Sequence, residues 1–180
     1  MAGVPLELVS LADIAPIAEP EETGATFEEN ARLKARYYAQ QSGLLTVAED
    51  SGLVVDALGG EPGVHSARFL RADASYLERF ADILRRLDQR AFVPRTARFV
   101  AALACVDRGQ VIYETTGVVE GEIADAPRGA GGFGYDPIFY YPAYRRTLAE
   151  VSEAEKVLVA HRGVAFRAFA AWLQETLQSC

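Results

Sequence analysis

The sequence is poor in cysteine and contains no long apolar run. Its two cysteines, Cys105 and Cys180, are too few for a disulfide framework, which indicates a reducing compartment such as the cytoplasm. No apolar run reaches the length of about 18 residues that a membrane span needs. The first residues carry no charged segment ahead of a long apolar one, so we expect no signal peptide. These absences predict a protein without a membrane-spanning segment.

Basic residues are also scarce. The 180-residue chain has 18 lysines and arginines against 25 acidic residues, a net charge of −7. Long nucleic acid needs a basic face, so this balance argues against nucleic-acid binding. A small anionic ligand stays possible, because a few cations in one pocket can bind it locally. With 50% of its residues hydrophobic, the chain is suited to a single domain spanning residues 1–180.

Several common catalytic motifs are missing. The two histidines, His65 and His161, and the absence of closely spaced cysteines exclude the usual zinc-ligand spacings. The chain has no Walker loop, no GxGxxG segment after a strand, and no Ser-His-Asp or Cys-His nucleophile pattern. Any chemistry must therefore reside in another kind of site.

Helical and extended patterns alternate along the chain. Thr26 and Glu29 form a capping-box pattern that predicts a helix through about Gln41, ended by Gly43. A second capping box at 152–155 predicts a C-terminal helical region. The other expected elements are strands at 6–11, 44–49 and 54–58 with a turn at 50–52, a helix capped by Asp73 and running to Arg90, and a hairpin of 96–106 and 110–119. This alternation predicts an α/β fold with a mixed sheet.

The most specific segment is the glycine-aromatic run at 131–139, GGFGYDPIF. Its glycines allow a backbone to approach a ligand closely or to adopt positive φ. Phe133 and Tyr135 offer flat faces to a planar ring, and Asp136 offers hydrogen-bond acceptors. Together these features predict a nucleobase pocket. The alternative is a glycine-rich hairpin capped by aromatic residues.

Acidic residues gather at two places. Glu49 and Asp50 follow an apolar segment, where a strand holds carboxylates and a turn exposes them, so they are candidates for a metal site or a general base. The alternative is an Asx-turn that Asp50 makes with Ser51 and Gly52. Glu22 precedes the first expected helix and could reach the same metal, or could lie in a solvated acidic loop.

Amide and cationic side chains form two further candidate sites. Asn30 and Lys34 are four positions apart on one helix face, where they could hold phosphate oxygens or, alternatively, face the solvent. Lys156, His161 and Arg162 make a compact patch of nitrogen-bearing side chains. The alternative there is a helix end whose basic residues suit the helix dipole.

Four segments, taken in order, resemble the motifs of one family. They are ETGATFEENARLKA at 22–35, AEDSGLVVDALGGEPGVHSAR at 48–68, the glycine-aromatic run at 131–139, and residues 149–163 with their Glu-Lys and His-Arg-Gly groups. The chain is thereby similar to the inosine triphosphate pyrophosphatase family, also called Ham1-like, over roughly residues 4–178. The resemblance implies an elongated, two-lobed α/β fold with a mixed sheet and a central cleft. It also implies a homodimer and the Mg²⁺-dependent hydrolysis of dITP, ITP and XTP to the monophosphate and pyrophosphate.

The same resemblance implies a role for each matching residue. Asp50 corresponds to the base that activates the attacking water, and Glu22, Glu49 and Asp50 correspond to the metal-binding acids. The residues implied in substrate binding are Asn30 and Lys34 at the triphosphate, Ser51, Phe133 stacked on the base with Tyr135 and Asp136 beside it, and Lys156, His161 and Arg162 around the nucleotide. The last two are expected near the purine 6-oxo group, where hydrogen-bond donors favour hypoxanthine and xanthine over adenine.

One departure from the family lies at the start of the sequence. Family members open with a strand, a Thr/Ser-x-Asn-x-x-Lys motif and a helix, whereas this chain reaches the segment 6–11 at once. We therefore expect the family's first strand and helix to be lacking and triphosphate binding to be weaker. A second hypothesis is a nucleotide-binding member with weak or no turnover, but the retained base and metal residues argue against it. A third, a pyrophosphatase for modified pyrimidine nucleotides, is disfavoured by the His161-Arg162 pair.

Overall fold

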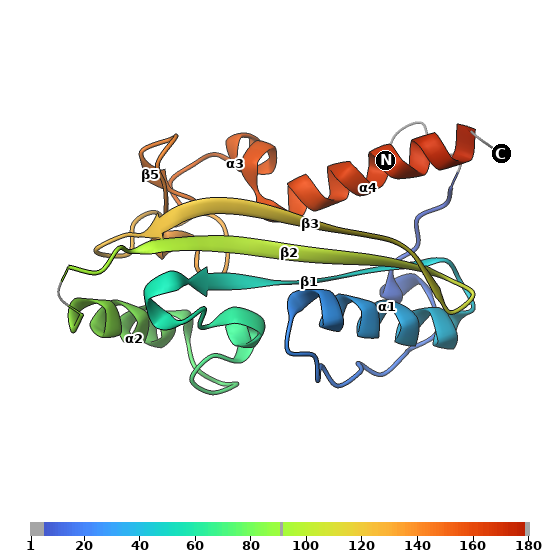
Figure 1. Ribbon diagram of the computed structural model, residues 1–180, viewed down its shortest axis with the longest axis horizontal. Coiled ribbons are helices and arrows are strands. Elements are labelled where there is room, and N and C mark those ends of the chain that lie inside the picture. Colours follow the sequence, from blue (N-terminus) through green and yellow to red (C-terminus); the bar gives the residue numbers. More distant parts are fainter. Residues whose placement is uncertain (1–5, 91, 179–180) are drawn as a thin grey trace.

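A computed structural model describes residues 6–90 and 92–178 and shows an elongated α/β structure around one long β-hairpin (Figure 1). Its sheet has five strands in the order β1-β2-β3-β4-β5, with bounds Thr46–Val55, Thr96–Asp107, Gln110–Ile123, Phe139–Tyr141 and Arg146–Thr147. The α-helices are α1 (Phe27–Ser42), α2 (Tyr76–Asp88), α3 (Glu153–Val159) and α4 (His161–Gln178). The short 3₁₀ helices of the described residues are η1 (Leu11–Asp13), η2 (Asp56–Leu58), η3 (Gly63–Arg68) and η4 (Asp136–Ile138). The α/β class is confirmed, and every strand pair among the described residues is antiparallel where a mixed sheet was predicted.

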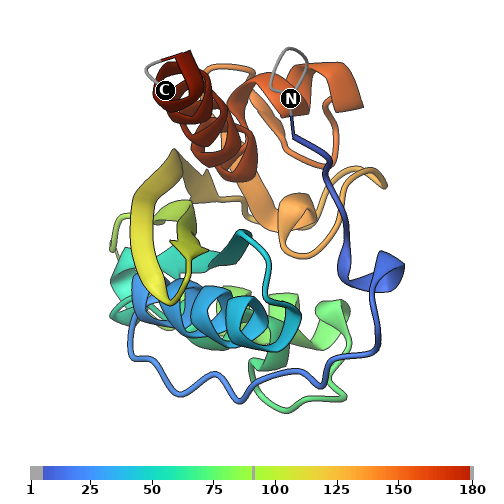
Figure 2. The same ribbon diagram turned by 90° about the vertical axis from the view of Figure 1, so that its right-hand side faces the viewer.

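The two faces of the sheet are covered by different helices (Figure 2). Alternate residues of a strand point to opposite faces, and β2 uses this alternation throughout its buried part. Ala102, Ala104 and Val106 pack against α1, whereas Ala101, Leu103 and Cys105 pack against α4. The small alanine side chains let both helices approach the sheet closely. The sheet therefore separates an α1 side from an α4 side, and this division decides where each site residue points.

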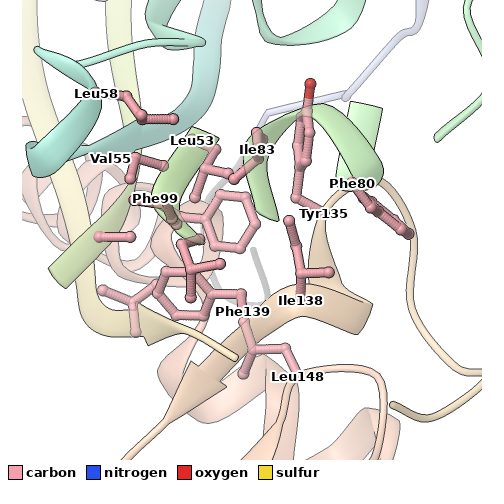
Figure 3. Packing of buried hydrophobic residues seen from close by; sticks show 14 of the residues in the cluster. Leu53, Val55, Leu58, Phe80, Ile83, Phe99, Tyr135, Ile138, Phe139 and Leu148 are labelled. Carbon is pink, nitrogen blue, oxygen red and sulfur yellow. The ribbon is translucent and has the colours of Figure 1, made fainter. Parts of the chain in front are cut away.

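The residues packed against α1 and against α4 form two hydrophobic clusters, and a third lies where β2 begins and β3 ends (Figure 3). It joins α2, η4 and β4 to the end of β1 and the start of β2. Leu53, Ile83, Ile138 and Phe139 are completely buried in it. Each such side chain contributes about 1.5–3 kcal/mol when fully buried. The rings of Phe99 and Phe139 are 4.5 Å apart, centroid to centroid. This cluster anchors the loop that carries the glycine-aromatic run.

The starts of α1, α2 and α3 follow local capping signals, and one of the predicted caps is wrong. The Thr26 hydroxyl accepts a hydrogen bond from the backbone N–H of Glu29, and Gly43, with φ of 71°, ends α1 as predicted. The capping box at 152–155 is confirmed, with Ser152 as N-cap of α3. The predicted cap of α2 at Asp73 is wrong: Ser75 caps this helix, because its side chain and that of Glu78 satisfy each other's backbone N–H groups.

Strand β1 is continuous, so the predicted turn at 50–52 and the two separate strands around it are wrong. Gly52 pairs with Val100 of β2 in the middle of the ladder. A Cβ atom at Gly52 would lie 2.3 Å from Ser66 Oγ and 2.6 Å from the carbonyl oxygen of Gly63. The glycine therefore marks the close approach of η3 to β1. Close approach of another backbone segment is a common reason for a glycine within a strand.

The expected strand at 6–11 is also wrong. Residues 6–10 have no regular structure and residues from Leu11 begin η1, because no described strand pairs with this segment to form a hydrogen-bond ladder. Cys105 is buried with a free thiol, and Cys180 lies outside the described residues. None of the helices in the described ranges is both long and apolar enough to cross a membrane.

Candidate active site

Asp50 lies at the centre of a polar cluster on the α1 side of β1. Its two carboxylate oxygens accept hydrogen bonds from Asn30 Nδ2 at 3.1 Å and from Lys34 Nζ at 2.8 Å. Asn30 is completely buried, and its Oδ1 accepts a hydrogen bond from the backbone N–H of Gly24. Because that bond uses the amide oxygen, the Asn30 nitrogen is directed at Asp50. The face of α1 that carries Asn30 and Lys34 is thus turned to Asp50, not to solvent.

Lys34 joins Asp50 to Glu22. Its ammonium lies 2.7 Å from Glu22 Oε1, and the second oxygen of Glu22 accepts from Arg68 Nη1 at 3.2 Å. Burial opposes the charge on Glu22, but the bonds and charges of Lys34 and Arg68 outweigh it and lower the pKa of Glu22. Burial likewise opposes the charge on Lys34, and Asp50 and Glu22 outweigh it and raise the pKa of Lys34. The lowered pKa of Glu22 and the raised pKa of Lys34 both favour the charged forms of this ion pair.

A cleft of about 700 Å³ opens beside this cluster. It is lined by Glu19, Pro20, Glu21, Glu22, Lys34, Tyr38, Ala67 and Arg68. The lining thus brings two cations and three carboxylates to one open space, which suits a ligand with phosphate oxygens and a bound divalent cation.

Glu49 lies on the opposite face of β1. Its Oε1 accepts hydrogen bonds from Arg162 Nε at 2.8 Å and from Ser51 Oγ at 3.4 Å. Ser51 Oγ in turn accepts from Arg162 Nη2 at 3.0 Å. The structure thus brings Glu49 and Ser51 together with Arg162 and places Glu49 away from Glu22 and Asp50, because adjacent residues of a continuous strand face opposite ways.

The loop of the glycine-aromatic run presents Phe133 to the solvent. This ring is 58% exposed, with Lys156 Nζ at 4.3 Å and the Arg162 guanidinium carbon at 5.2 Å from its centroid. Asp136 is buried, accepts from the backbone N–H of Phe133 at 2.7 Å and pairs with Lys156. Gly132, with φ of 71°, leaves room for the Asp136 carboxylate, which a Cβ atom would approach to 2.2 Å. Asp136 therefore holds the loop in shape.

Tyr135 and His161 are buried and line a second pocket, which lies beside Phe133. The Tyr135 hydroxyl donates to the carbonyl oxygen of Ser66 at 2.8 Å, and burial raises the pKa of Tyr135, so it stays neutral. His161 stacks on Phe99 with centroids 4.9 Å apart and planes 12° apart. Burial, with the charges of Arg162 and Lys156, lowers the pKa of His161 to about 4. Its neutral ring has one donor and one acceptor, and Nδ1 has no partner among the described residues.

This second pocket has a volume of about 270 Å³ and draws its walls from both sides of β1. Its lining residues are Ser51, Gly52, Ser66, Ala67, Tyr76, Phe99, Phe133, Gly134, Tyr135, Asp136, His161 and Arg162. The set combines an exposed aromatic face with a neutral imidazole and a guanidinium. Such a combination can stack a planar heterocycle and hydrogen-bond its edge.

Two arginines near the pockets were not among the predicted site residues. Arg68 pairs with Glu22, and the signal for it was its place at the end of the segment 48–68. Arg79 is buried in α2, with its guanidinium carbon 4.9 Å from the centroid of the Tyr76 ring and its Nη atoms near the carbonyl oxygens of Ser66, Arg71 and Ala72. No sequence signal distinguished Arg79 from the other charged residues of an amphipathic helix.

Comparison with known proteins places these pockets in context. The model of the Ham1 family matches residues 1–172. A dITP/XTP pyrophosphatase of Thermus thermophilus is 52% identical over 163 residues, which cover 89% of this chain and 77% of that protein. The dITP/XTP pyrophosphatase of Geobacillus kaustophilus is 46% identical over 160 residues, with 89% and 78% covered. Among solved structures, the Staphylococcus aureus Ham1 protein superimposes with a TM-score of 0.88 at 37% identity, with 94% of this chain and 88% of that chain covered.

Proposed function

The chain belongs to the Ham1 family, and on that basis we propose that the Asp50 cluster and the Phe133 pocket form the active site of a nucleoside triphosphate pyrophosphatase. The enzyme hydrolyses non-canonical purine nucleoside triphosphates. We propose dITP, ITP and XTP as the substrates and the monophosphate and pyrophosphate as the products. The observation that carries this proposal is the orientation of the Asp50 carboxylate by Asn30 and by Lys34, a residue that itself lines the larger cleft.

Asp50 is proposed as the general base. Its carboxylate accepts bonds from Asn30 and from the ammonium of Lys34 and has lone pairs beyond these two. It takes a proton from a water molecule while the water oxygen forms a bond to the α-phosphorus. The bond from that phosphorus to the bridging oxygen breaks, and pyrophosphate leaves with the electron pair. Lys34 and Arg68 offset the negative charge of the phosphates in the larger cleft.

The donor set at this cleft fits a divalent cation, which we propose to be Mg²⁺. No group of three or more metal-binding side chains occurs within residues 6–90 and 92–178, but Mg²⁺ usually takes only one or two protein carboxylates and completes its shell with substrate phosphates and water. Glu22 and Asp50, which share Lys34 between them, are the acids that would hold it. When bound, the ion neutralises charge that develops on the phosphate oxygens.

The smaller pocket is proposed to bind the purine. Phe133 offers a ring for stacking, which is worth about 1–3 kcal/mol per base in nucleic-acid sites. His161 and Arg162 offer donors to a 6-oxo group. An adenine 6-amino group would leave such donors unpaired, at a cost of about 1–3 kcal/mol each. The pocket thus favours hypoxanthine and xanthine.

Three further features are proposed for the protein as a whole. Residues 1–180 act as one domain, which is supported by the continuous β1 and β2 strands that run through all three hydrophobic clusters. The resemblance to the family supports a homodimer, which sedimentation analysis would test. The scarcity of cysteine supports a cytoplasmic location.

The proposed function is tested by pyrophosphate release from dITP, ITP, XTP and ATP, each with Mg²⁺ and with a chelator. We expect release from the three 6-oxo nucleotides, little from ATP, and none without the cation. A chain that binds ITP but releases no pyrophosphate would support the non-catalytic alternative. Equal rates with ATP and ITP would contradict the proposed base pocket.

A further inference from the structure

We propose that Glu49 is a positioning residue, which orients Arg162 toward the purine pocket from the face of β1 opposite to Asp50. This inference rests on the proposed function, because it takes the pocket beside Phe133 to be the base site. It gives Glu49 a role different from that of the metal-binding acids. Strand β1 then carries the proposed base Asp50 on one face and the residue that orients Arg162 on the other.

The pairing of β1 with β2 shows why Glu49 cannot join the Asp50 cluster without a change in the strand. Glu49 is paired with Leu103, whose side chain packs on the α4 side, and Asp50 is paired with Ala102, which packs on the α1 side. Directly paired residues of an antiparallel sheet lie on the same face. The Glu49 carboxylate is thus directed away from Glu22.

The contacts of Glu49 form a closed triangle with Ser51 and Arg162. Glu49 Oε1 accepts from both partners, and the Ser51 hydroxyl accepts from the guanidinium. A guanidinium carries five N–H donors in a rigid plane, and these bonds use Nε and Nη2. Within the described ranges no hydrogen bond is made by Nη1, although Arg162 lines the 270 Å³ pocket beside Phe133. The triangle therefore fixes the plane of the guanidinium and leaves donors free for a ligand.

The second oxygen of Glu49 makes this carboxylate costly to bury. Glu49 Oε2 is buried and has no hydrogen-bond partner among the described residues, an arrangement that disfavours the folded state. An uncharged side chain would lower this penalty but would lose the charge-assisted bond to Arg162 Nε. The Glu49 carboxylate also partly offsets the charges that Lys156 and Arg162 bring to the Phe133 ring.

The inference predicts a change in base selection without a change in metal dependence. Glu49→Gln keeps the shape of the side chain and removes its charge, so Arg162 is held less firmly. We expect the KM for dITP to rise about tenfold, the scale of one charge-assisted hydrogen bond. We expect kcat to change less than about threefold, since Asp50 is untouched. The Mg²⁺ concentration for half-maximal rate should stay the same, whereas Glu22→Gln should raise it.

A matched control is available at the other end of β1. Asp56, the first residue of η2 directly after β1, pairs with Arg98 Nη2 at 2.7 Å and lines neither pocket. Asp56→Asn removes an acid from an ion pair just beyond the end of this strand and should leave KM and the preference for ITP over ATP unchanged. Thermal unfolding of each variant checks that the fold is kept.

Two results would overturn the inference. One is a raised Mg²⁺ requirement in Glu49→Gln like that of Glu22→Gln, which would make Glu49 a metal ligand. The other comes from a double-mutant cycle with Arg162→Ala. If Glu49 acts through Arg162, then Glu49→Gln should add almost nothing in that background, whereas a full additional loss would show an independent role.

Product binding separates this inference from the proposed function. We would measure the Kd of IMP and of AMP by calorimetry with the wild-type chain and with Glu49→Gln. The wild type should bind IMP more tightly than AMP, and the ratio of the two Kd values should fall about tenfold in the variant. A wild type that prefers IMP but releases no pyrophosphate would refute the catalytic function and leave the role of Glu49 intact. An unchanged preference in Glu49→Gln would refute that role, whatever the turnover.

Discussion

The substitution Asp50→Asn separates the chemical role of Asp50 from its structural one. The change is nearly isosteric but removes a carboxylate that accepts bonds from Asn30 and Lys34. Loss of a general base lowers the rate by about 10²–10⁴-fold. We therefore expect kcat for dITP to fall by that factor.

The stability of this variant follows from the neighbours of Asp50. Lys34 keeps its contact with Glu22 at 2.7 Å, so its partly buried ammonium is not left without a counter-charge. The loss is then about that of one charge-assisted hydrogen bond, about 1.5–3 kcal/mol. For a chain of this length each kcal/mol lowers Tm by about 2–4 °C, so Tm should fall by roughly 3–12 °C.

The assay is pyrophosphate release at saturating nucleotide over a range of Mg²⁺ concentrations, with unfolding followed by circular dichroism. Glu22→Gln is the comparison, because it removes a proposed metal-binding acid and keeps the proposed base. High Mg²⁺ should restore part of the rate of Glu22→Gln but not the rate of Asp50→Asn. Turnover of Asp50→Asn within a few fold of the wild type would refute the assignment of Asp50 as the base.

Three further predictions concern the base pocket, the strand and the response to pH. Phe133→Ala should raise the KM for ITP more than it lowers kcat, because stacking holds the ground state and the transition state alike; an unchanged KM would place the base elsewhere. Gly52→Ala should lower the free energy of unfolding in urea by about 1–3 kcal/mol, because its Cβ would meet Ser66 Oγ at 2.3 Å and the Gly63 carbonyl at 2.6 Å; an unchanged midpoint would show that η3 moves away freely. The pKa of His161 is lowered to about 4 in the folded chain, against about 6.5 in an unfolded one, so the unfolded state binds the proton first and the free energy of unfolding should fall as the pH drops from about 6.5 to about 4. His161→Gln should show a smaller fall over that range. The free energy of unfolding in urea would be measured for both proteins at pH 7, 5.5 and 4.5, and an equal fall in the two would contradict the lowered pKa.

Features that depend on short stretches of chain could be predicted from the sequence. Thr26 and Gly43 mark the ends of α1 because a capping hydroxyl and a left-handed C-terminal residue act on backbone groups only a few positions away. The hairpin of β2 and β3 could be predicted for the same reason, from two extended runs joined at Arg108-Gly109. The order of four motifs along the chain was enough to identify the family, which the comparisons confirm.

Features that depend on contacts between distant segments could not be predicted in this way. The segment around Gly52 has the composition of a turn, but pairing with Val100 and packing against Ser66 keep it in a strand. Likewise, Arg68 belongs to a pocket only because η3 carries it to Glu22, 46 residues away. Local propensity contains no information on such partners.

The amino-acid sequence by itself determined which side chains are available for phosphate, metal and base chemistry, and in what order they occur. The tertiary structure alone decided how they are divided. Glu49 and Asp50 are neighbours in sequence and were predicted to act on one metal, yet they meet different partners, Arg162 and Lys34. The reason is that side chains alternate between the two faces of an extended strand. Pairing with β2 keeps β1 extended from Thr46 to Val55, so the adjacent carboxylates point to opposite faces of the sheet.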